Sequence, residues 1–271
     1  MSLYAVLGYP VGHSLSPRIH EAFAALTGRA VRYERREVPP GQLAAALSAL
    51  AADGGQGANI TVPLKGEAFA LASRVSARAR RARAVNTLSR EDGGWAGDNT
   101  DGAGLVCDLT VNCGWPLRDR RVFLAGAGGA AQGIAGPLLD AGIAALVVFN
   151  RTPGRAEALV AACADPRAMV AGAGCADGPF DLVINATAAG LSGGLPALPA
   201  GLFAGAAAYD LMYGPKAWAF LSYARAHGAR QVADGLGMLV EQAAESFFVW
   251  HGVRPPTAPV LSRLRAEIDQ A

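Results

Sequence analysis

The sequence has few cysteines, and they follow no metal-binding or redox pattern. Its four cysteines are Cys107, Cys113, Cys163 and Cys175. None forms a C-x-x-C pair, and no histidine lies at metal-ligand spacing from them. This spacing gives no support to a redox partner protein that acts through its thiols. It favours free cysteines in a reducing compartment, so we expect no metal site and a cytoplasmic location.

Long apolar runs and a strong charge of one sign are also missing. No apolar stretch approaches the ~18 residues that a membrane-spanning helix needs. Met1 leads directly into a strand-like segment, so we expect no secretory signal. The net charge of +2 is too small to predict nucleic acid or an anionic membrane as a partner. We therefore expect a small-molecule ligand and neither of those partners.

The composition and length predict a folded protein of about two domains. Hydrophobic residues make up 52% of the 271 residues, which is enough for ordinary cores. Strand-like segments over 3–8, 31–38 and 57–62 alternate with helical ones, and a hairpin is expected around Asp92-Gly93. The sequence predicts an α/β fold with two lobes, over 1–112 and 119–236, and C-terminal helices over 237–271 that return to the first lobe. Small ligands usually bind in a cleft between such lobes.

A glycine-rich segment in the second lobe predicts a dinucleotide site. Gly126 to Ala131 matches G-x-G-x-x-A and lies between a buried strand pattern over 121–125 and a helical stretch. The first glycine permits a tight turn, the second lets the backbone approach a pyrophosphate, and Ala131 allows close helix–strand packing. A second apolar run over 144–149 completes the βαβ unit. We therefore expect a Rossmann-like lobe with the pyrophosphate on the helix N-terminus.

The end of the second strand indicates which dinucleotide is bound. An NAD-binding unit usually has Asp or Glu there, bonded to the ribose 2′-hydroxyl. This chain has Asn150-Arg151-Thr152-Pro153-Gly154-Arg155 and no carboxylate. Two guanidiniums could pair with a 2′-phosphate, so the loop predicts NADP. Thr152 and Pro153 also suit the start of a helix, but capping alone would not explain both arginines.

Lys65 occupies a position that helix stability would not choose. It follows the strand-like segment 57–62 and lies in the first turn of a helix opened by Pro63. A cation there opposes the helix dipole by ~0.3–1 kcal/mol. Acid–base chemistry is one explanation and a solvated surface lysine is the other. Asp101 could orient this lysine, although it could also be the N-cap of its own helix.

Uncharged polar residues complete a candidate pocket. Ser14 and Ser16 supply two hydroxyls at a helix start, where backbone N–H groups also attract a carboxylate. Ser16 is expected to cap that helix. Asn86 ends a strand and offers its amide toward the same place. The candidate set also contains Asn59, Thr61 and Gln242, and such side chains suit a small polyhydroxylated acid.

The chain resembles the shikimate dehydrogenase family from end to end. The resemblance rests on eight segments in order: Gly12-His13-Ser14-Leu15-Ser16-Pro17, 57–65, Ala84-Val85-Asn86-Thr87, 97–102, 126–130, Asn150-Arg151-Thr152, Asn185-Ala186-Thr187 and Asp234-Gly235-Leu236-Gly237-Met238-Leu239. It implies reversible NADP-linked reduction of 3-dehydroshikimate to shikimate, in the route to chorismate and the aromatic amino acids. Lys65 and Asp101 would be the catalytic pair.

The resemblance also implies which residues bind each ligand. The family's substrate positions correspond here to Ser14, Ser16, Asn59, Thr61, Lys65, Asn86, Asp101, Tyr213 and Gln242. Its cofactor positions correspond to Gly126, Ala127, Gly128, Gly129, Ala130, Asn150, Arg151, Thr152, Arg155, Thr187, Leu211 and Gly237.

The sequence departs from the family pattern in a few places. The family often has an acid where this chain has Ala77, and methionine is common where it has Leu211. Residues 214–218 differ from the usual segment containing Thr-Pro, and the arginines of 78–83 are expected on a solvated helix face. Three alternatives stay open: a broader quinate/shikimate dehydrogenase, a catalytically silent NADP-binding regulator, and either a monomer or a homodimer.

Overall fold

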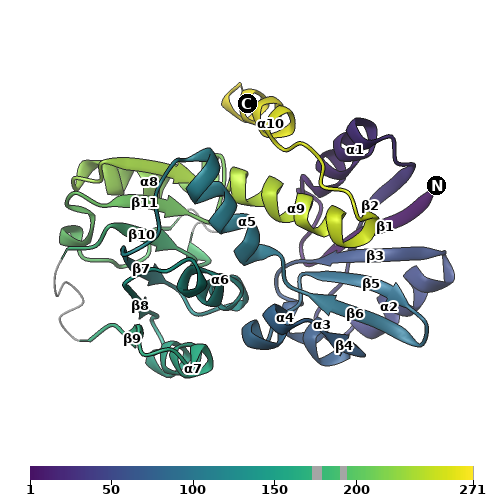
Figure 1. Cartoon of the computed structure of the whole chain (residues 1–271), viewed down its shortest axis with the longest axis horizontal. Coiled ribbons are helices and arrows are strands. Elements are labelled where there is room, and N and C mark those ends of the chain that lie inside the picture. The colour runs from purple at the N-terminus through teal and green to yellow at the C-terminus, as the bar shows by residue number, and fades with distance from the viewer. Residues whose placement is uncertain (173–178, 190–193, 271) are drawn as a thin grey trace.

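The computed structural model describes residues 1–172, 179–189 and 194–270, which form two six-stranded sheets flanked by helices (Figure 1). The strands of the first sheet come from residues up to 98, and those of the second come from 121–234. The expected α/β fold with two lobes is confirmed.

The first lobe is a mixed sheet with strand order β2-β1-β3-β5-β6-β4. β1 pairs in parallel with β2 and β3, whereas β5 pairs antiparallel with β3 and β6. Gly93 has φ +88° in the turn between β5 and β6, which confirms the predicted hairpin. The strands are β1 (Ser2–Gly8), β2 (Val31–Glu37), β3 (Gly55–Ile60), β4 (Arg74–Val75), β5 (Thr87–Glu91) and β6 (Gly94–Asp98). The helices are α1 (Ser16–Thr27), α2 (Leu43–Ala52), α3 (Lys65–Leu71) and α4 (Ala77–Ala82).

The second lobe is a parallel sheet with strand order β12-β11-β10-β7-β8-β9. Its strands are β7 (Arg121–Ala125), β8 (Ala145–Phe149), β9 (Ala168–Val170), β10 (Leu182–Asn185), β11 (Ala207–Asp210) and β12 (Gln231–Asp234). Its helices are α6 (Gly129–Asp140), α7 (Pro153–Cys163), the 3₁₀ turn Ala200–Phe203 and α8 (Pro215–Ala226). The order reverses between β7 and β10, the place where open α/β sheets bind ligands. The Rossmann-like prediction is therefore confirmed.

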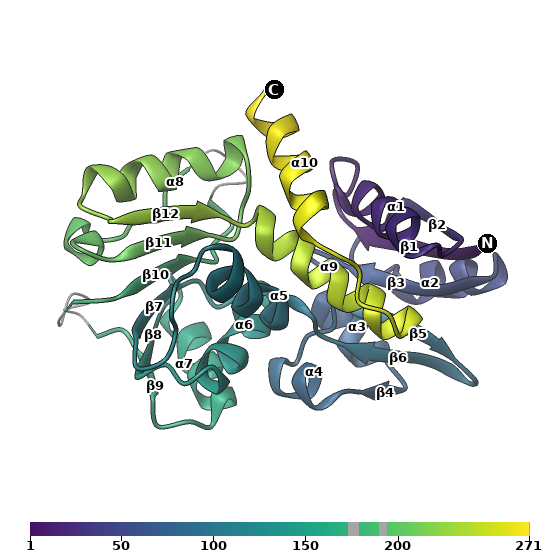
Figure 2. The ribbon, with the colours of Figure 1, turned by 45° about the horizontal axis from the view of Figure 1, so that its top comes forward.

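The helices that precede and follow the second sheet in the chain connect the lobes. α5 (Asp101–Cys107) continues as a π-helix over Asp108–Asn112. The chain returns through α9 (Leu236–His251) and ends in α10 (Ala258–Asp269). Figure 2 shows α9 passing between the lobes and α10 lying beside α1. Ile19 and Phe23 of α1 share one buried cluster with residues of α9 and α10, so the C-terminal helices do return to the first lobe.

Two glycines allow α5 and α6 to pack closely. A Cβ on Gly102 would lie 2.2 Å from Pro137 Cγ and 2.7 Å from the carbonyl oxygen of Gly133. A Cβ on Gly133 would lie 3.0 Å from Asp101 Oδ2 and from Asn99 Oδ1. The nucleotide-lobe helix therefore lies directly against the start of α5.

The basic segment forms the expected solvated helix face only in part, since Arg80 and Arg83 are exposed but Arg78 and Arg81 are paired with acids. Arg78 on α4 binds Asp98 through Nε and Nη2 at 2.7 and 2.6 Å, and its Nη1 lies 2.9 Å from Glu245. Arg81 Nη1 contacts Asp140 of α6 at 2.7 Å, so this pair connects the two lobes. The sequence could not show these partners, because each is distant along the chain.

The α5–α6 contact generates a stability prediction. Gly102→Ala should lower the free energy of unfolding by about 1–3 kcal/mol, because the added methyl overlaps Pro137 and a backbone oxygen. Gly66→Ala on α3 is the control, since a Cβ there meets nothing within 4 Å. The control should match the wild type or exceed it by up to about 1 kcal/mol. Urea unfolding of the three proteins measures the difference, and equal stability of both variants would contradict the packing argument.

Candidate active site

The structure brings Lys65 and Asp101 together. Lys65 Nζ lies 2.6 Å from Asp101 Oδ2, and the two side chains are only 13% and 5% exposed. Lys65 begins α3 and Asp101 begins α5, while the N-cap position of α5 is Thr100. Lys65 is therefore not a solvated surface lysine, and Asp101 is not an N-cap. The two residues form a largely buried ion pair at the junction of the lobes.

Asn86 holds the other oxygen of the Asp101 carboxylate. Its Nδ2 donates to Asp101 Oδ1 at 2.8 Å, and its Oδ1 accepts from the N–H of Thr100 at 2.8 Å. The same Nδ2 lies 3.2 Å from Gln242 Oε1, and Gln242 Nε2 donates to the carbonyl of Leu239 at 2.8 Å. These bonds fix the orientation of the Asp101 carboxylate toward Lys65.

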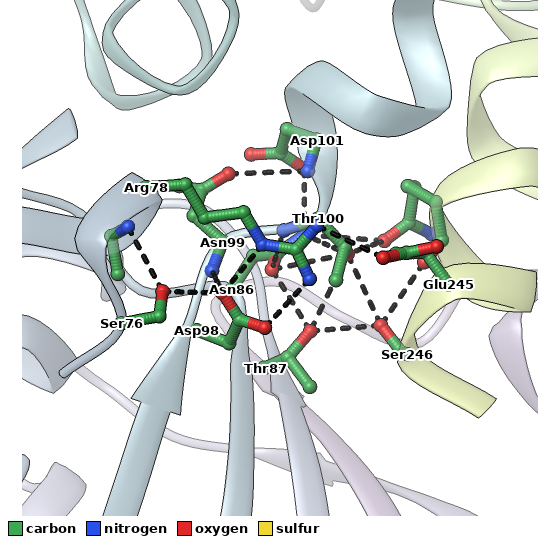
Figure 3. A network of polar contacts seen from close by, with 12 residues as sticks. Ser76, Arg78, Asn86, Thr87, Asp98, Asn99, Thr100, Asp101, Glu245 and Ser246 are labelled. Atoms are coloured by element: carbon green, nitrogen blue, oxygen red, sulfur yellow. Dashed lines mark hydrogen bonds and ion pairs between the residues drawn. The ribbon is translucent and has the colours of Figure 1, made fainter. Parts of the chain in front are cut away.

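A layer of buried hydroxyl groups lies behind Asn86 (Figure 3). Thr87 Oγ1 lies 2.8 Å from Ser246 Oγ, and Thr100 Oγ1 lies 3.1 Å from the same atom. Thr87 Oγ1 donates to Asn86 Oδ1 at 2.9 Å. Sequence reasoning did not select Thr87, Thr100 or Ser246. The available signal was the position of each threonine next to a predicted site residue; Ser246 had no such signal.

Asn59 connects this layer to Tyr33. Its Oδ1 accepts from the Tyr33 hydroxyl at 2.7 Å, and its Nδ2 donates to Ser246 Oγ at 3.0 Å. Burial raises the pKa of Tyr33 well above its usual value, so the phenol remains a donor. Asn59 is itself buried, and both ends of its amide are bonded to protein groups. Tyr33 was not selected from the sequence.

The two serines are adjacent, but their roles at the helix differ from the prediction. Ser14 Oγ accepts from the N–H of Ser16 at 3.3 Å and donates to Ser16 Oγ at 3.1 Å. The N-cap of α1 is Leu15, with no side-chain capping bond. The expectation that Ser16 caps α1 is therefore wrong. Ser16 is the first helical residue rather than the residue before the helix, so its side chain is not in the capping position.

Thr61 and Tyr213 lie on opposite sides of the lobe junction. Thr61 follows β3 and packs on Gly8, where a Cβ would lie only 2.3 Å from Thr61 Cγ2. Tyr213 follows β11 of the second lobe and packs on the cluster that contains Ile19 and Phe23 of the first lobe. A second-lobe side chain is thus in contact with the first lobe.

The predicted cofactor residues gather at one edge of the parallel sheet. They follow the carboxyl ends of β7, β8, β10, β11 and β12, where dinucleotides bind in such folds. Gly126 has φ +113°, and a Cβ there would lie 2.8 Å from the carbonyl oxygen of Ala186. Gly128 is the N-cap of α6, and a Cβ there would meet nothing within 4 Å. This open backbone fits a pyrophosphate.

The glycine turn faces the catalytic candidates. A Cβ on Gly129 would lie 3.7 Å from Lys65 Cβ and 3.9 Å from Lys65 Cδ. The aliphatic stem of Lys65 therefore lies near the first turn of α6, with room for about one methyl group between them. The two parts of the predicted site, one from each lobe, face each other.

The loop after β8 presents two exposed arginines. Neither Arg151 nor Arg155 forms an ion pair with any residue that the structure describes. Asn150 Nδ2 donates to the carbonyl of Thr152 at 2.9 Å. Thr152 is the N-cap of α7 by position, but its side chain makes no capping bond. The guanidiniums are available for an anion.

A buried carboxyl group, that of Asp210, lies at the carboxyl end of β11, on the same edge of the parallel sheet. Thr187 Oγ1 donates to Asn185 Oδ1 at 2.7 Å, and Asn185 Nδ2 donates to Asp210 Oδ2 at 3.0 Å. The N–H of Leu211 is bonded to the carbonyl of Asn185 at 2.9 Å. Asp210 is 1% exposed, and burial raises its pKa to about 7. Sequence reasoning did not select Asp210.

Gly237 is required by packing as well as expected at the cofactor. A Cβ there would lie 1.8 Å from Asp108 Oδ1 on the π-helix. The Asp108 carboxylate accepts from the Tyr209 hydroxyl at 2.6 Å, and burial raises the pKa of Asp108. A larger side chain at 237 would displace this buried pair.

Among the residues that the structure describes, no group of three or more His, Cys, Asp or Glu could hold a metal ion, and no helix is long and apolar enough to cross a membrane. Cys107, Cys113 and Cys163 are free, while Cys175 lies outside the described residues.

A dinucleotide-type turn beside a largely buried Lys–Asp pair is the arrangement of a Rossmann-type oxidoreductase. Family models agree: residues 6–88 match the shikimate dehydrogenase substrate binding domain, residues 110–191 match shikimate / quinate 5-dehydrogenase, and residues 235–265 match the shikimate 5′-dehydrogenase C-terminal domain. The shikimate dehydrogenase (NADP(+)) of Xanthomonas euvesicatoria pv. vesicatoria is 57% identical over 273 residues, covering 98% of this chain and 96% of the relative. The chain belongs to the shikimate dehydrogenase family.

Solved structures agree with this assignment. The chain is similar to an Ael1 enzyme from Pseudomonas putida, with a TM-score of 0.91 and 44% identity over 97% of this chain and 98% of that one. It is also similar to the shikimate 5-dehydrogenase of Thermus thermophilus in complex with NADP(H) and shikimate. That match has a TM-score of 0.87 and 37% identity over 98% of this chain and 99% of that one.

The raised pKa of the buried Asp210 carboxyl predicts how the stability of the folded protein changes with pH. Its pKa rises from the usual 3.8 to about 7 in the folded protein, so the folded state binds this proton more tightly than the unfolded state. Its contribution to stability is therefore complete below about pH 4 and is lost as the pH rises toward about 7. Asp210→Asn should remove this loss and flatten the dependence of melting temperature on pH in that window.

Asp119→Asn is the matched control, because Asp119 is exposed on the same lobe. It should keep the wild-type slope between pH 4 and 7, even if its absolute melting temperature changes. Identical slopes for wild type and Asp210→Asn would show that Asp210 does not titrate in this window.

Proposed function

We propose that this chain catalyses the reversible NADP-linked interconversion of 3-dehydroshikimate and shikimate, in the route to chorismate and the aromatic amino acids. The observation that carries the proposal is the 2.6 Å contact between Lys65 Nζ and Asp101, with Lys65 near the first turn of α6. The relatives that carry the name shikimate dehydrogenase (NADP(+)) support the choice of substrate and cofactor.

The cofactor would lie along the carboxyl edge of the parallel sheet. The turn over 126–130 would hold its pyrophosphate, and Arg151 with Asn150, Thr152 and Arg155 would hold its 2′-phosphate. Thr187, Leu211 and Gly237 would border its nicotinamide end, at the ends of three further strands. When bound, NADPH supplies the hydride for reduction of the carbonyl carbon.

Lys65 would move the proton. In the direction of reduction, its ammonium donates a proton to the oxygen of the forming alkoxide, and its charge stabilises that oxygen beforehand. Asp101 holds the ammonium at 2.6 Å, and Asn86 holds Asp101 at 2.8 Å. The three side chains thus place one proton at a fixed position, and the reverse reaction returns it to Lys65.

The remaining polar residues would bind the substrate. Ser14 and Ser16 would bind its carboxylate, since their hydroxyls lie 3.1 Å apart at the start of α1. Its hydroxyl groups would be bound by Thr61, Asn86, Asp101, Tyr213 and Gln242. Asn59 would support the pocket from its buried side rather than bind the substrate directly, because its amide is already bonded to Tyr33 and Ser246.

The proposal assigns a role to each part of the chain. Residues 1–112 would form the substrate lobe, residues 119–236 the NADP lobe, and residues 237–271 helices that complete the substrate lobe. A cytoplasmic location fits the free thiols. A monomer and a homodimer are both compatible with this arrangement.

An absorbance assay at the NADPH band tests the activity. Shikimate and quinate are each combined with NADP and with NAD, and shikimate with NADP should have the highest kcat/KM. Comparable rates with quinate would favour the broader quinate/shikimate dehydrogenase. No turnover of either acid would favour the catalytically silent regulator.

The role of Lys65 predicts a loss of turnover. Lys65→Ala should lower kcat by ~10²–10⁴-fold, the usual contribution of a positioned proton donor, with a smaller change in KM. Lys65→Arg is the matched variant, because arginine keeps the charge but does not release a proton near neutral pH. It should retain substrate affinity without recovering kcat. Near-normal kcat in either variant would remove Lys65 from the mechanism.

The exposed arginines after β8 lead us to expect that the protein prefers NADP to NAD. Arg151→Ala should remove one charged contact worth ~1.5–3 kcal/mol, so NADP should bind about tenfold or more weakly. NAD binding should change little. Arg230→Ala, at the amino end of β12 and thus the opposite edge of the sheet, should leave both affinities unchanged. Equal weakening of NADP and NAD by Arg151→Ala would make that arginine structural.

A further inference from the structure

Arg35 presents a positive charge at the loop that carries the two serines. It lies on β2, and its Nε and Nη2 donate to the carbonyl oxygen of Ser14 at 2.9 and 2.6 Å. The guanidinium is therefore fixed beside the residue that is proposed to bind the substrate carboxylate. Its side chain remains exposed.

Lys216 lies at the start of α8 in the other lobe. It is the second residue of α8 and follows Tyr213, which packs on the buried cluster that α1, α9 and α10 form. A Cβ on Gly214 would lie 3.1 Å from Ile268 Cγ2 of α10. The start of α8 is thus held against the first lobe and the C-terminal helix.

The two cations act on the same neighbour. Burial lowers the pKa of His13, and the positive charges of Lys216 and Arg35 lower it further. His13 directly precedes Ser14 in the chain. One cation from each lobe therefore contributes to the potential at the serine loop.

Neither cation is neutralised by an acid of the described residues. No ion pair there involves Arg35 or Lys216. Asp234 accepts from the N–H of Gly214 at 2.9 Å, but Arg265 already pairs with it at 2.8 and 2.5 Å. A lysine in the first turn of α8 also opposes the helix dipole. Glu37, the acid two residues after Arg35 on β2, accepts from the N–H of Val11 at 3.4 Å and forms no ion pair with either cation.

We propose that Arg35 and Lys216 are specificity determinants that select a substrate bearing a carboxylate, one cation acting from each lobe. The inference rests on the proposed function and deepens it. The hydroxyls of Ser14 and Ser16 can donate to a neutral ester as well as to an acid, because they carry no charge. The two cations discriminate between such molecules, since only the anion gains from their field.

Kinetics with an acid and its neutral ester test the proposal. Lys216→Gln removes the charge at an exposed position, Lys216→Arg keeps it, and Arg225→Gln removes an exposed charge from the last turn of the same helix. At about 20 mM ionic strength, Lys216→Gln should raise KM for shikimate about 3- to 10-fold, and at about 300 mM the effect should shrink. Lys216→Arg and Arg225→Gln should resemble the wild type.

Shikimate methyl ester is the discriminating substrate. KM for the ester should rise much less in Lys216→Gln than KM for the acid. An equal rise for acid and ester, or a rise only in KM for NADP, would overturn the proposal. An inactive wild type would instead defeat the proposed function, and calorimetric titration of shikimate into wild type and Lys216→Gln would still test the role of Lys216.

Chemical labelling gives an independent measurement, because Lys65 and Lys216 are the only lysines of the chain. Acylation by an amine reagent, read by peptide mass spectrometry, reports on each lysine separately. Shikimate should protect Lys216, and its methyl ester should protect Lys216 less. Equal protection by both compounds, or none by shikimate, would overturn the role assigned to Lys216.

Discussion

The close contact between α5 and α6 is the constraint on which the rest of the site depends. Gly102 and Gly133 leave no room for a side chain, so the helix that begins at the dinucleotide turn lies against the carboxylate of Asp101. Lys65, which pairs with Asp101, lies near the first turn of the same helix. The catalytic pair comes from the first lobe and the dinucleotide turn from the second, so the relative position of the lobes sets the distance between them.

A largely buried ion pair needs further hydrogen bonds to be stable, because removing both charges from water is costly. Asn86 supplies one such bond to Asp101, and its own oxygen is held by Thr100 and Thr87. Ser246 connects those hydroxyls to α9, the helix that returns from the second lobe. The C-terminal segment therefore contributes to the orientation of Asp101 as well as to the core of the first lobe. Such networks fix one arrangement when every member is satisfied.

The features that sequence reasoning found are those with local causes. The glycine turn was predictable because φ +113° at Gly126 demands glycine, and Gly128 follows at the spacing of the dinucleotide motif. The features that it missed depend on partners far along the chain, as with Arg78 and Glu245 or Thr87 and Ser246. The capping error at Ser16 has another cause. The helix starts one residue earlier than expected, which places Leu15 at the N-cap and Ser16 inside the helix, and the N–H of Ser16 donates to Ser14 Oγ instead. Sequence signals do not resolve a helix start to one residue.

The positions of the two lysines are explained by the chemistry of the site rather than by the stability of the helices that contain them. Only two of the 24 Lys and Arg residues are lysines, and both lie in the first turn of a helix at the lobe junction, where the dipole opposes a cation. Where the chain needs a cation for structure it uses arginine, as in the contacts of Arg78 and Arg265 with carboxylates. At position 65 arginine would keep the charge but would not exchange a proton near neutral pH, so the side chain there must be lysine. At position 216 the proposed role needs only a positive charge, and the ammonium there is exposed and has no ion-pair partner among the described residues, whereas the guanidinium of Arg35 is bonded to the Ser14 carbonyl.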